Sequence, residues 1–281
     1  MSKFLSDVAR TEFDTNVKLA YQGGSKLRDT VEYRTGIVGD TYKFRLMGKG
    51  RGHQRTGSSS LVVPMDIAHS LPSATLTDHE HPEYTDIFDQ ATVNFDEKRK
   101  LTETIGKAMG RTEDQIIIDT AVAGTYNTTA TDGEGFSIVA GGTGFTVAKL
   151  LALRAYYDNL EVEEDVCIVV SGTGMQSLLT NAELTSTDTN TVRALVGGKA
   201  DSYMGFTFKT VGSRRLEGGL GGSGLVAYAW APNAIGMASG SIEKSMSVDY
   251  IPERVSYLCN GMLKAGSTII DPEGTAKIAF A

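Results

Sequence analysis

The sequence is short of cysteine and proline and contains no long apolar run. Its 281 residues include two cysteines and six prolines against thirty-two glycines. Cys167 and Cys259 lie in apolar, strand-like segments, which favours buried free thiols in a reducing compartment over a disulfide. No apolar stretch reaches the length of about 18 residues that a membrane span needs, and no charged-then-apolar leader opens the chain. We therefore expect a protein made in the cytosol, with no membrane partner.

Positive charge is scarce overall and concentrated near the N-terminus. The net charge is −7, yet residues 1–60 carry eleven Lys and Arg against six Asp and Glu. A basic segment of this kind is one pattern of a nucleic-acid-binding tail. Here, however, basic and acidic residues alternate, and no cluster of aromatic and basic residues accompanies them. We favour a basic arm that lies on the acidic body of a neighbouring copy, because complementary charges set the register between partners.

The histidines offer the one pattern that resembles a metal site. In Asp78-His79-Glu80-His81, a strand would place both imidazoles on one face, as a metal site needs. Nothing nearby supplies a positioned third ligand. We expect His79 and His81 to be ordinary solvated residues, and we expect no metal and no cofactor.

A strand–turn–helix pattern over Val166–Thr180 has the context of phosphate loops and nucleophile elbows. Its turn, Gly172-Thr173-Gly174, completes neither motif. We expect Ser171 or Thr173 to cap the helix by accepting a backbone N–H. No catalytic group of residues emerges, so the sequence does not predict an enzyme.

The strongest periodic pattern covers residues 97–123 and ends at Gly124. Apolar residues recur at spacings of three and four, which predicts a helix of about 40 Å with one face on a core. The expected core residues are Leu101, Ile105, Ala108, Met109 and Ile116. Gly106 and Gly110 each cost about 1 kcal/mol relative to Ala inside a helix. We therefore expect another backbone to cross closely there, and we interpret this helix as a spine.

Residues 41–86 are the least core-like part of the chain. The segment Thr41–Met47 alternates apolar and basic residues, which is typical of a strand with one apolar face. Glycine and proline punctuate residues 48–85. We predict a long two-stranded hairpin, running out over 41–60 and back over 61–86, with the histidine pair in its exposed part. Such a ribbon is barely stable alone in water, so we expect it to rest on another molecule.

The remaining segments predict sparse helices and late strands, which indicates an α+β fold. We expect helices at 11–22, 147–159, 174–180 and 191–195, strands at 166–171, 203–211, 225–230 and beyond 245, and a mobile loop at 125–144. The glycines near 141–144 and 218–224 are candidate hinges.

Several short motifs, taken in order, resemble the major capsid proteins of tailed bacteriophages, particularly the short-tailed branch. The motifs are Phe13-Asp14-x-x-Val17-Lys18-x-Ala20-Tyr21-Gln22, Ser25-Lys26-Leu27-Arg28-x-x-Val31, Lys49-Gly50-Arg51-Gly52 and Ala108-x-Gly110-Arg111-x-x-Asp114-x-x-Ile117-Ile118-x-x-Ala121. The resemblance implies the Hong Kong 97 type capsid fold. It divides the chain into an N-terminal arm (1–40), an extended loop (41–86), a peripheral-domain spine helix (87–124), an axial domain (125–240) and peripheral-domain strands with the C-terminus (241–281).

The resemblance also implies a function. Copies of a major capsid protein self-assemble through pentamers and hexamers into an icosahedral head that encloses double-stranded DNA. The implied partners are the chain itself, a scaffolding protein, a portal and decoration proteins, and the implied location is the virion, assembled in the host bacterial cytoplasm. The candidate inter-subunit contacts are Phe13, Val17, Tyr21, Lys26, Arg28, Lys43, Arg45, Lys49, Arg51 and Arg55.

Two alternatives stay open at this point. One is an encapsulin-like compartment shell of the same fold, and the other is a soluble enzyme that uses the 166–180 turn or the histidine pair. Some capsid relatives join an extended-loop Lys to an Asn of a neighbour. For Lys43, Lys49 and Asn260 no acidic catalyst can be assigned, so we assign no such crosslink to them.

Overall fold

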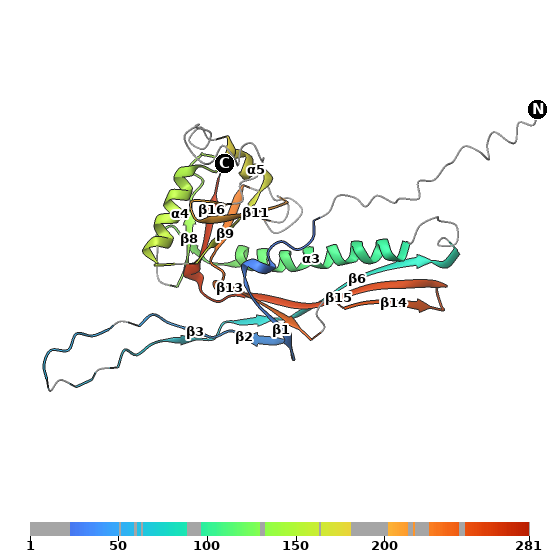
Figure 1. Ribbon diagram of the computed structural model, residues 1–281, viewed down its shortest axis with the longest axis horizontal. Helices are drawn as coiled ribbons and strands as arrows, with labels where there is room; N and C mark the ends of the chain where they lie inside the picture. Colours follow the sequence, from blue (N-terminus) through green and yellow to red (C-terminus); the bar gives the residue numbers. More distant parts are fainter. Residues whose placement is uncertain are drawn as a thin grey trace, which may run out of the picture.

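The computed structural model describes residues 23–50, 52–58, 61–62, 64–88, 97–129, 133–162, 164–180, 202–212, 216, 225–241 and 245–280. The predicted α+β class is confirmed: two sheets, one long helix and a thin ribbon make up an elongated molecule (Figure 1). The predicted helices at 11–22 and 191–195 and the hinge candidate at 218–224 lie outside the described residues.

The long helix α3 (Glu97–Ala123) lies along a five-stranded sheet, as Figure 1 shows. The sheet has the order β1-β13-β15-β14, and β6 also pairs with β15. Its strands are β1 (Glu32–Ile37), β6 (Thr77–Asp86), β13 (Ile235–Gly240), β14 (Ser245–Ile251) and β15 (Ser256–Ile269). The long strand β15 is antiparallel to β6, β13 and β14, so it joins the whole sheet together.

The buried face of α3 differs from the predicted one in its second half. Ile105 and Met109 are buried against β15, as expected, whereas Leu101, Ala108 and Ile116 are only half-buried. The buried residues of the second half are Glu113, Asp114, Ile117, Ile118 and Ala121. The predicted core face included neither carboxylate, because periodicity does not reveal partners supplied by a distant segment.

Of the two helix glycines, only Gly110 is crossed closely by another backbone. A Cβ atom at Gly110 would lie 2.7 Å from the backbone nitrogen of Ser25, which is closer than atoms can approach. At Gly106 a Cβ atom would meet only the Cε of Met246, at 3.4 Å. The prediction of a close crossing is therefore confirmed at Gly110 and wrong at Gly106.

The second sheet has seven strands in the order β10-β11-β9-β12-β16-β8-β7. They are β7 (Tyr126–Asn127), β8 (Gly135–Ile138), β9 (Val166–Ser171), β10 (Ser202–Tyr203), β11 (Phe206–Val211), β12 (Val226–Trp230) and β16 (Thr275–Ala279). Helices α4 (Val147–Asn159) and α5 (Gly172–Leu179) pack with it, and its core includes Trp230, Tyr157, Phe145 and Phe206.

Three expectations about these sheets need correction. The last strand, β16, was expected in the same unit as β14 and β15, yet it pairs with β12 and β8 in the seven-stranded sheet. Conversely, β13 was expected in the 125–240 unit and instead lies in the five-stranded sheet between β1 and β15. The predicted mobile loop at 125–144 contains β7 and β8. Local alternation predicts a strand, but it does not say which sheet the strand joins.

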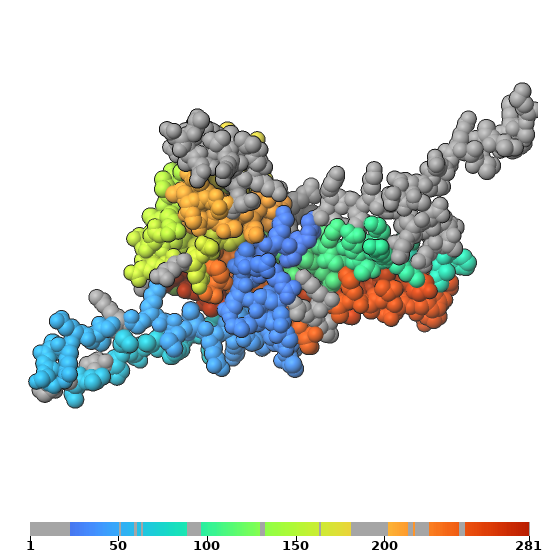
Figure 2. All heavy atoms as spheres, viewed as in Figure 1, coloured from blue at the N-terminus to red at the C-terminus, as the bar shows by residue number. Residues whose placement is uncertain are grey.

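The ribbon comprises residues 41–76 and is shorter than predicted. Within it, β2 (Thr41–Lys43) pairs with β5 (Ser73–Thr75), and β3 (Leu46–Met47) pairs with β4 (His69–Ser70). The expected return limb at 77–86 is strand β6, which pairs with β15 along its length. The outer part of the ribbon projects well beyond the body in the space-filling view (Figure 2).

Candidate functional site

The histidine pair lies beneath the spine helix and not in the exposed ribbon. The Nε2 of His81 is 2.9 Å from the Thr112 hydroxyl on α3, and the Nε2 of His79 is 2.9 Å from the Thr77 hydroxyl. Burial and the neighbouring His81 lower the pKa of His79. Both rings are half-buried, so the expectation of solvated residues is wrong. Within the described ranges, no group of three metal-ligating side chains converges.

The turn after β9 is a helix cap. The Ser171 hydroxyl accepts a hydrogen bond from the backbone N–H of Gly174 at 3.1 Å, as predicted for a capping residue. Ser171 is fully buried, and a Cβ atom at Gly174 would lie 2.7 Å from the ring of Phe280, which leaves no space for a substrate there. Burial raises the pKa of the nearby Cys167 thiol to about 12, so this thiol stays protonated and unreactive at neutral pH.

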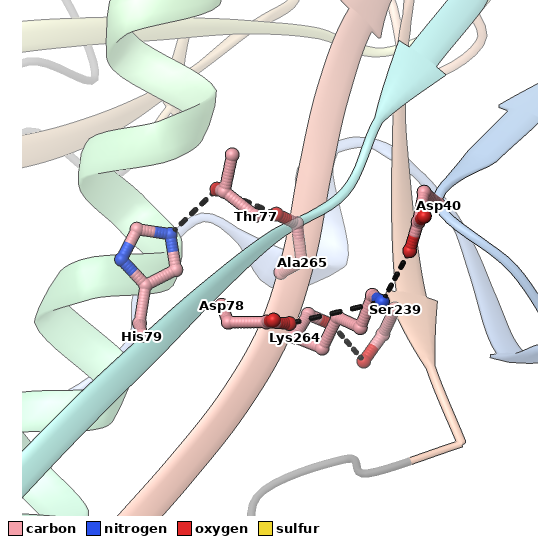
Figure 3. Close-up of polar contacts among 7 residues, drawn as sticks. All are labelled: Asp40, Thr77, Asp78, His79, Ser239, Lys264 and Ala265. Carbon is pink, nitrogen blue, oxygen red and sulfur yellow. Dashed lines mark hydrogen bonds and ion pairs between the residues drawn. The ribbon is translucent and has the colours of Figure 1, made fainter.

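These positions hold no reactive centre, so the candidate functional site is the surface of the projecting ribbon. The base of the ribbon is held by a charged group around Lys264 on β15, shown in Figure 3. The Lys264 ammonium lies 2.6 Å from a carboxylate oxygen of Asp40, at the start of the ribbon, and 3.8 Å from one of Asp78 on β6. The Asp40 carboxylate raises the pKa of Lys264, and Lys264 in turn lowers the pKa of Asp40. Because both acids are largely exposed, this group contributes orientation more than stability.

A small hydrophobic core under the ribbon base supplies the stronger attachment. It consists of Phe44, Ala74, Leu76, Ala238 and Ile270. Its packing depends on two glycines of the sheet. A Cβ atom at Gly236 would lie 2.5 Å from the Phe44 ring, and one at Gly266 would lie 2.0 Å from the backbone oxygen of Thr75. The ribbon base is thus pressed directly onto the backbone of β13 and β15.

A cleft of about 400 Å³ separates the ribbon base from the seven-stranded unit. Lys49 of the ribbon crosses it to form an ion pair with Glu273, and this pair lowers the pKa of Glu273. In the wall of the cleft opposite the ribbon, Asn233 donates to Glu164. Burial in this wall raises the pKa of Asp271. The ribbon is therefore tied to both sheets at its base.

The ribbon also exposes apolar side chains. Val62 is 95% exposed, Leu61 91%, and Met47, Met65 and Leu71 are each more than half exposed. Exposed apolar side chains are ordinary when scattered singly, but a group of them on a projecting ribbon marks an interaction surface. The isolated chain leaves this surface uncovered.

The structure places the predicted contact residues in several environments. Lys26 donates to the Thr210 carbonyl at 2.9 Å, and Arg28 lies over the Tyr33 ring at 4.0 Å. Lys49 pairs with Glu273 as described, and Arg55 donates to the Ser58 carbonyl inside the ribbon. Lys43 and Arg45 are exposed on the ribbon base. Phe13, Val17, Tyr21 and Arg51 lie outside the described residues.

The sequence reasoning missed the residues that attach the ribbon. Phe44 was placed on the apolar face of a strand, but its partners on β13 and near the end of β15 lie about two hundred residues away in the chain. Lys264 and Asp40 carry no strong local signal that distinguishes them from other exposed charges. The one hint is that Lys264 is the single charged residue between Asn260 and Ile270.

Comparisons with known proteins find matches over nearly the whole chain. A model of the family described as phage capsid protein matches residues 5–281. A capsid structure of the cyanophage P-SCSP1u is 17% identical with a TM-score of 0.77, covering 99% of this chain and 94% of that one. The capsid of an empty GTA particle is 10% identical with a TM-score of 0.76, covering 100% and 98%. A structure of Mycobacterium phage Che8 is 13% identical with a TM-score of 0.73, covering 95% and 96%.

At these identities the solved structures show a shared fold. No curated protein sequence matches the chain. None of the helices in the described part of the chain has both the length and the apolarity that crossing a bilayer requires.

Proposed function

Because the chain belongs to the phage capsid protein family, as a major capsid protein of an icosahedral head, we propose that its ribbon and arm join neighbouring copies in pentamers and hexamers. The predicted family and the Hong Kong 97 type fold are confirmed. The protein is a structural component of the virion. Within this fold, we assign the ribbon to the extended loop, the seven-stranded unit to the axial domain, and α3 with its sheet to the peripheral domain.

The observation that carries this proposal is the uncovered apolar ribbon. A two-stranded ribbon has no second layer of its own, so its apolar side chains stay wet until another surface covers them. Leu61 and Val62 are more than nine-tenths exposed in the isolated chain. A neighbouring subunit in a closed shell would supply the missing layer. Because such contacts run head to tail, they close into rings and then into a particle.

Charge supports the same arrangement. Residues 1–60 are net positive, while the rest of the chain carries sixteen basic against twenty-eight acidic residues. We propose that the exposed Lys43 and Arg45 and the basic arm face acidic surfaces of neighbours. Such contacts set register and weaken in salt.

Other expected partners follow from the role of a head protein. We propose that a scaffolding protein and a portal take part in assembly in the host bacterial cytoplasm, and that decoration proteins bind the finished shell. The shell encloses DNA without reading its sequence, since a net-negative body limits binding to phosphates.

We propose no enzymatic role. The particle contents, DNA or a cargo enzyme, distinguish this role from that of an encapsulin-like shell.

Deletion of residues 48–62 tests the role of the ribbon. We expect soluble, folded subunits that do not form shells, as seen by electron microscopy and light scattering. Normal shells from this deletion would contradict the proposal.

A sharper pair of variants is Val62→Ser and Val38→Ser. Both valines are more than 90% exposed in the isolated subunit, but only Val62 lies on the outer ribbon. We expect Val62→Ser to lower shell yield and Val38→Ser to leave it unchanged.

A further inference from the structure

Where the N-terminal arm enters the body, it meets the spine helix at a buried carboxylate. We call residues 23–31 the arm root. Asp114 on α3 has no exposed surface, and its Oδ1 accepts hydrogen bonds from the backbone N–H groups of Lys26 and Leu27, both at 3.0 Å. The Ser25 hydroxyl donates to the same oxygen at 3.1 Å, and the Lys26 N–H also lies 3.0 Å from Oδ2. One side chain thus holds three consecutive residues of the arm root.

The contact satisfies groups that the arm root cannot satisfy alone. Lys26 and Leu27 stand just before the short 3-10 helix η1 (Arg28–Thr30), whose N-cap, Leu27, has no side chain able to accept a hydrogen bond. Buried backbone N–H groups need an acceptor, and the N–H of an N-cap residue normally receives it from a Glu or Gln three positions later. That position is Thr30, whose hydroxyl donates to the Leu27 carbonyl instead. Here the acceptor comes from Asp114, 87 residues further along the chain.

The helix surface beside Asp114 is shaped for the same segment. Gly110 is one turn earlier on α3, and a Cβ atom there would lie 2.7 Å from the Ser25 nitrogen and 3.4 Å from the Gly24 carbonyl carbon. The Arg111 guanidinium donates to the Gly23 carbonyl at 3.2 Å. Two segments that stand as separate motifs in the sequence, 25–31 and 108–121, therefore meet in one contact.

The far side of the arm root is fixed as well. The Trp230 indole N–H lies 3.1 Å from the Thr30 carbonyl oxygen, and Leu27 and Val31 belong to the main core. The arm root therefore lies between α3 and the seven-stranded sheet. Its direction is set where these two units meet.

We propose that Asp114 and Gly110 form an arm clasp, a positioning device that fixes the point and direction at which residues 1–22 leave the subunit, so that the arm is aimed at a neighbour before assembly. This inference rests on the proposed function, in which the arm contacts another copy. Asp114 acts on assembly through the arm root and touches no partner itself.

The substitution Gly110→Ala, with Gly106→Ala as its control, tests the clasp without removing a charge. Both changes replace a helix glycine, and each gains about 1 kcal/mol of helix propensity. At Gly106 the new methyl group meets only a flexible methionine end, whereas at Gly110 it meets the Ser25 backbone. Asp114→Ala provides a second variant that removes the acceptor, with the exposed Asp119→Ala as its control.

Hydrogen exchange of the full-length subunit gives the first measurement. We expect the amides of Lys26 and Leu27 to exchange about tenfold faster or more in both clasp variants, because Asp114→Ala removes their acceptor and Gly110→Ala pushes their segment away from it. The amides of β9 should not change, and neither control should alter the arm root. Unchanged exchange at Lys26 and Leu27 in both clasp variants would overturn the clasp.

Shell yield by electron microscopy gives the second measurement, alongside a chain that lacks residues 1–22. We expect the two clasp variants to lose shells as the truncated chain does, while the controls assemble. If the truncated chain fails to assemble but both clasp variants assemble normally, the clasp is overturned and the arm contacts stand. If the truncated chain assembles like the wild type, the arm contacts of the proposed function are wrong, and the role of the clasp in assembly falls with them.

Discussion

Replacing Phe44 with alanine should free the ribbon base while leaving the rest of the subunit folded. The Phe44 ring is 4% exposed, and it packs in a core separate from the main one. Three of its neighbours there are small: Ala74 and Ala238 carry single methyl groups, and Gly236 lies directly against the ring. Leu76, Ile270 and the edge-on Tyr42 ring complete the surroundings, and we expect them to fill only part of the space that the ring leaves.

The size of the effect follows from this packing. Truncation of a buried phenylalanine costs about 3 kcal/mol or more when the surroundings cannot collapse. Two-stranded ribbons are only marginally stable, so a loss of this size is larger than the free energy that keeps the strands of the ribbon base paired. The open form of the base should become more populated by a factor on the order of a hundred. The seven-stranded sheet should be unaffected, because Phe44 is not part of its core.

Two probes separate the local from the global effect. Hydrogen exchange reports on β2 and β5, and the fluorescence of Trp230, the single tryptophan, reports on the seven-stranded sheet. In Phe44→Ala we expect faster exchange in both strands, an unchanged Trp230 unfolding midpoint and a loss of shells. The neighbouring Val38→Ala, at an exposed position, should change none of these. Slow exchange in the ribbon base of Phe44→Ala, or an equal fall in the Trp230 midpoint, would refute the reasoning.

Two further predictions concern charged groups. Lys149 donates to the backbone carbonyls of Ala140, Thr143 and Ala279 at 2.8–3.0 Å. Lys149→Met should therefore lower the free energy of unfolding by about 2 kcal/mol, because buried acceptors lose their donor. An unchanged Trp230 unfolding midpoint in denaturant would contradict this. Lys264 lowers the pKa of Asp40, so their interaction is present above the unfolded pKa of about 3.9 and is lost as the pH falls through the folded value. At pH 7, Asp40→Asn should therefore speed exchange in β2 relative to the wild type, and the difference should shrink as the pH is lowered step by step below about 3.9. A difference that stays constant as the pH falls would contradict the assignment.

The elements that local patterns define were predictable from the sequence. The bounds of α3, α4 and β9 follow from apolar periodicity and from the residues that end each segment. The Ser171 cap follows from the preference for serine before a helix. Thr146, by contrast, stands at the N-cap of α4, but its side chain forms no capping hydrogen bond. A capping residue marks a helix start better than it predicts the hydrogen bond itself.

What the sequence could not predict depends on contacts between distant segments. The burial of the carboxylates Glu113 and Asp114 could not be predicted, because their partners lie in residues 25–33. The glycines near 141–144 are typical of a hinge, but Lys149 fixes that loop to the end of β16. The pairing of β6 with β15 was also hidden, since the charged residues of β6 resemble those of an exposed ribbon. In each case the missing information is a partner and not a propensity.

Cryo-electron microscopy of particles assembled from the full chain tests most directly whether this subunit is completed by its neighbours. We predict density for the outer ribbon across an adjacent subunit, with Leu61 and Val62 covered by that copy. A ribbon folded back on its own subunit, or a purified chain that stays a single compact copy, would contradict it.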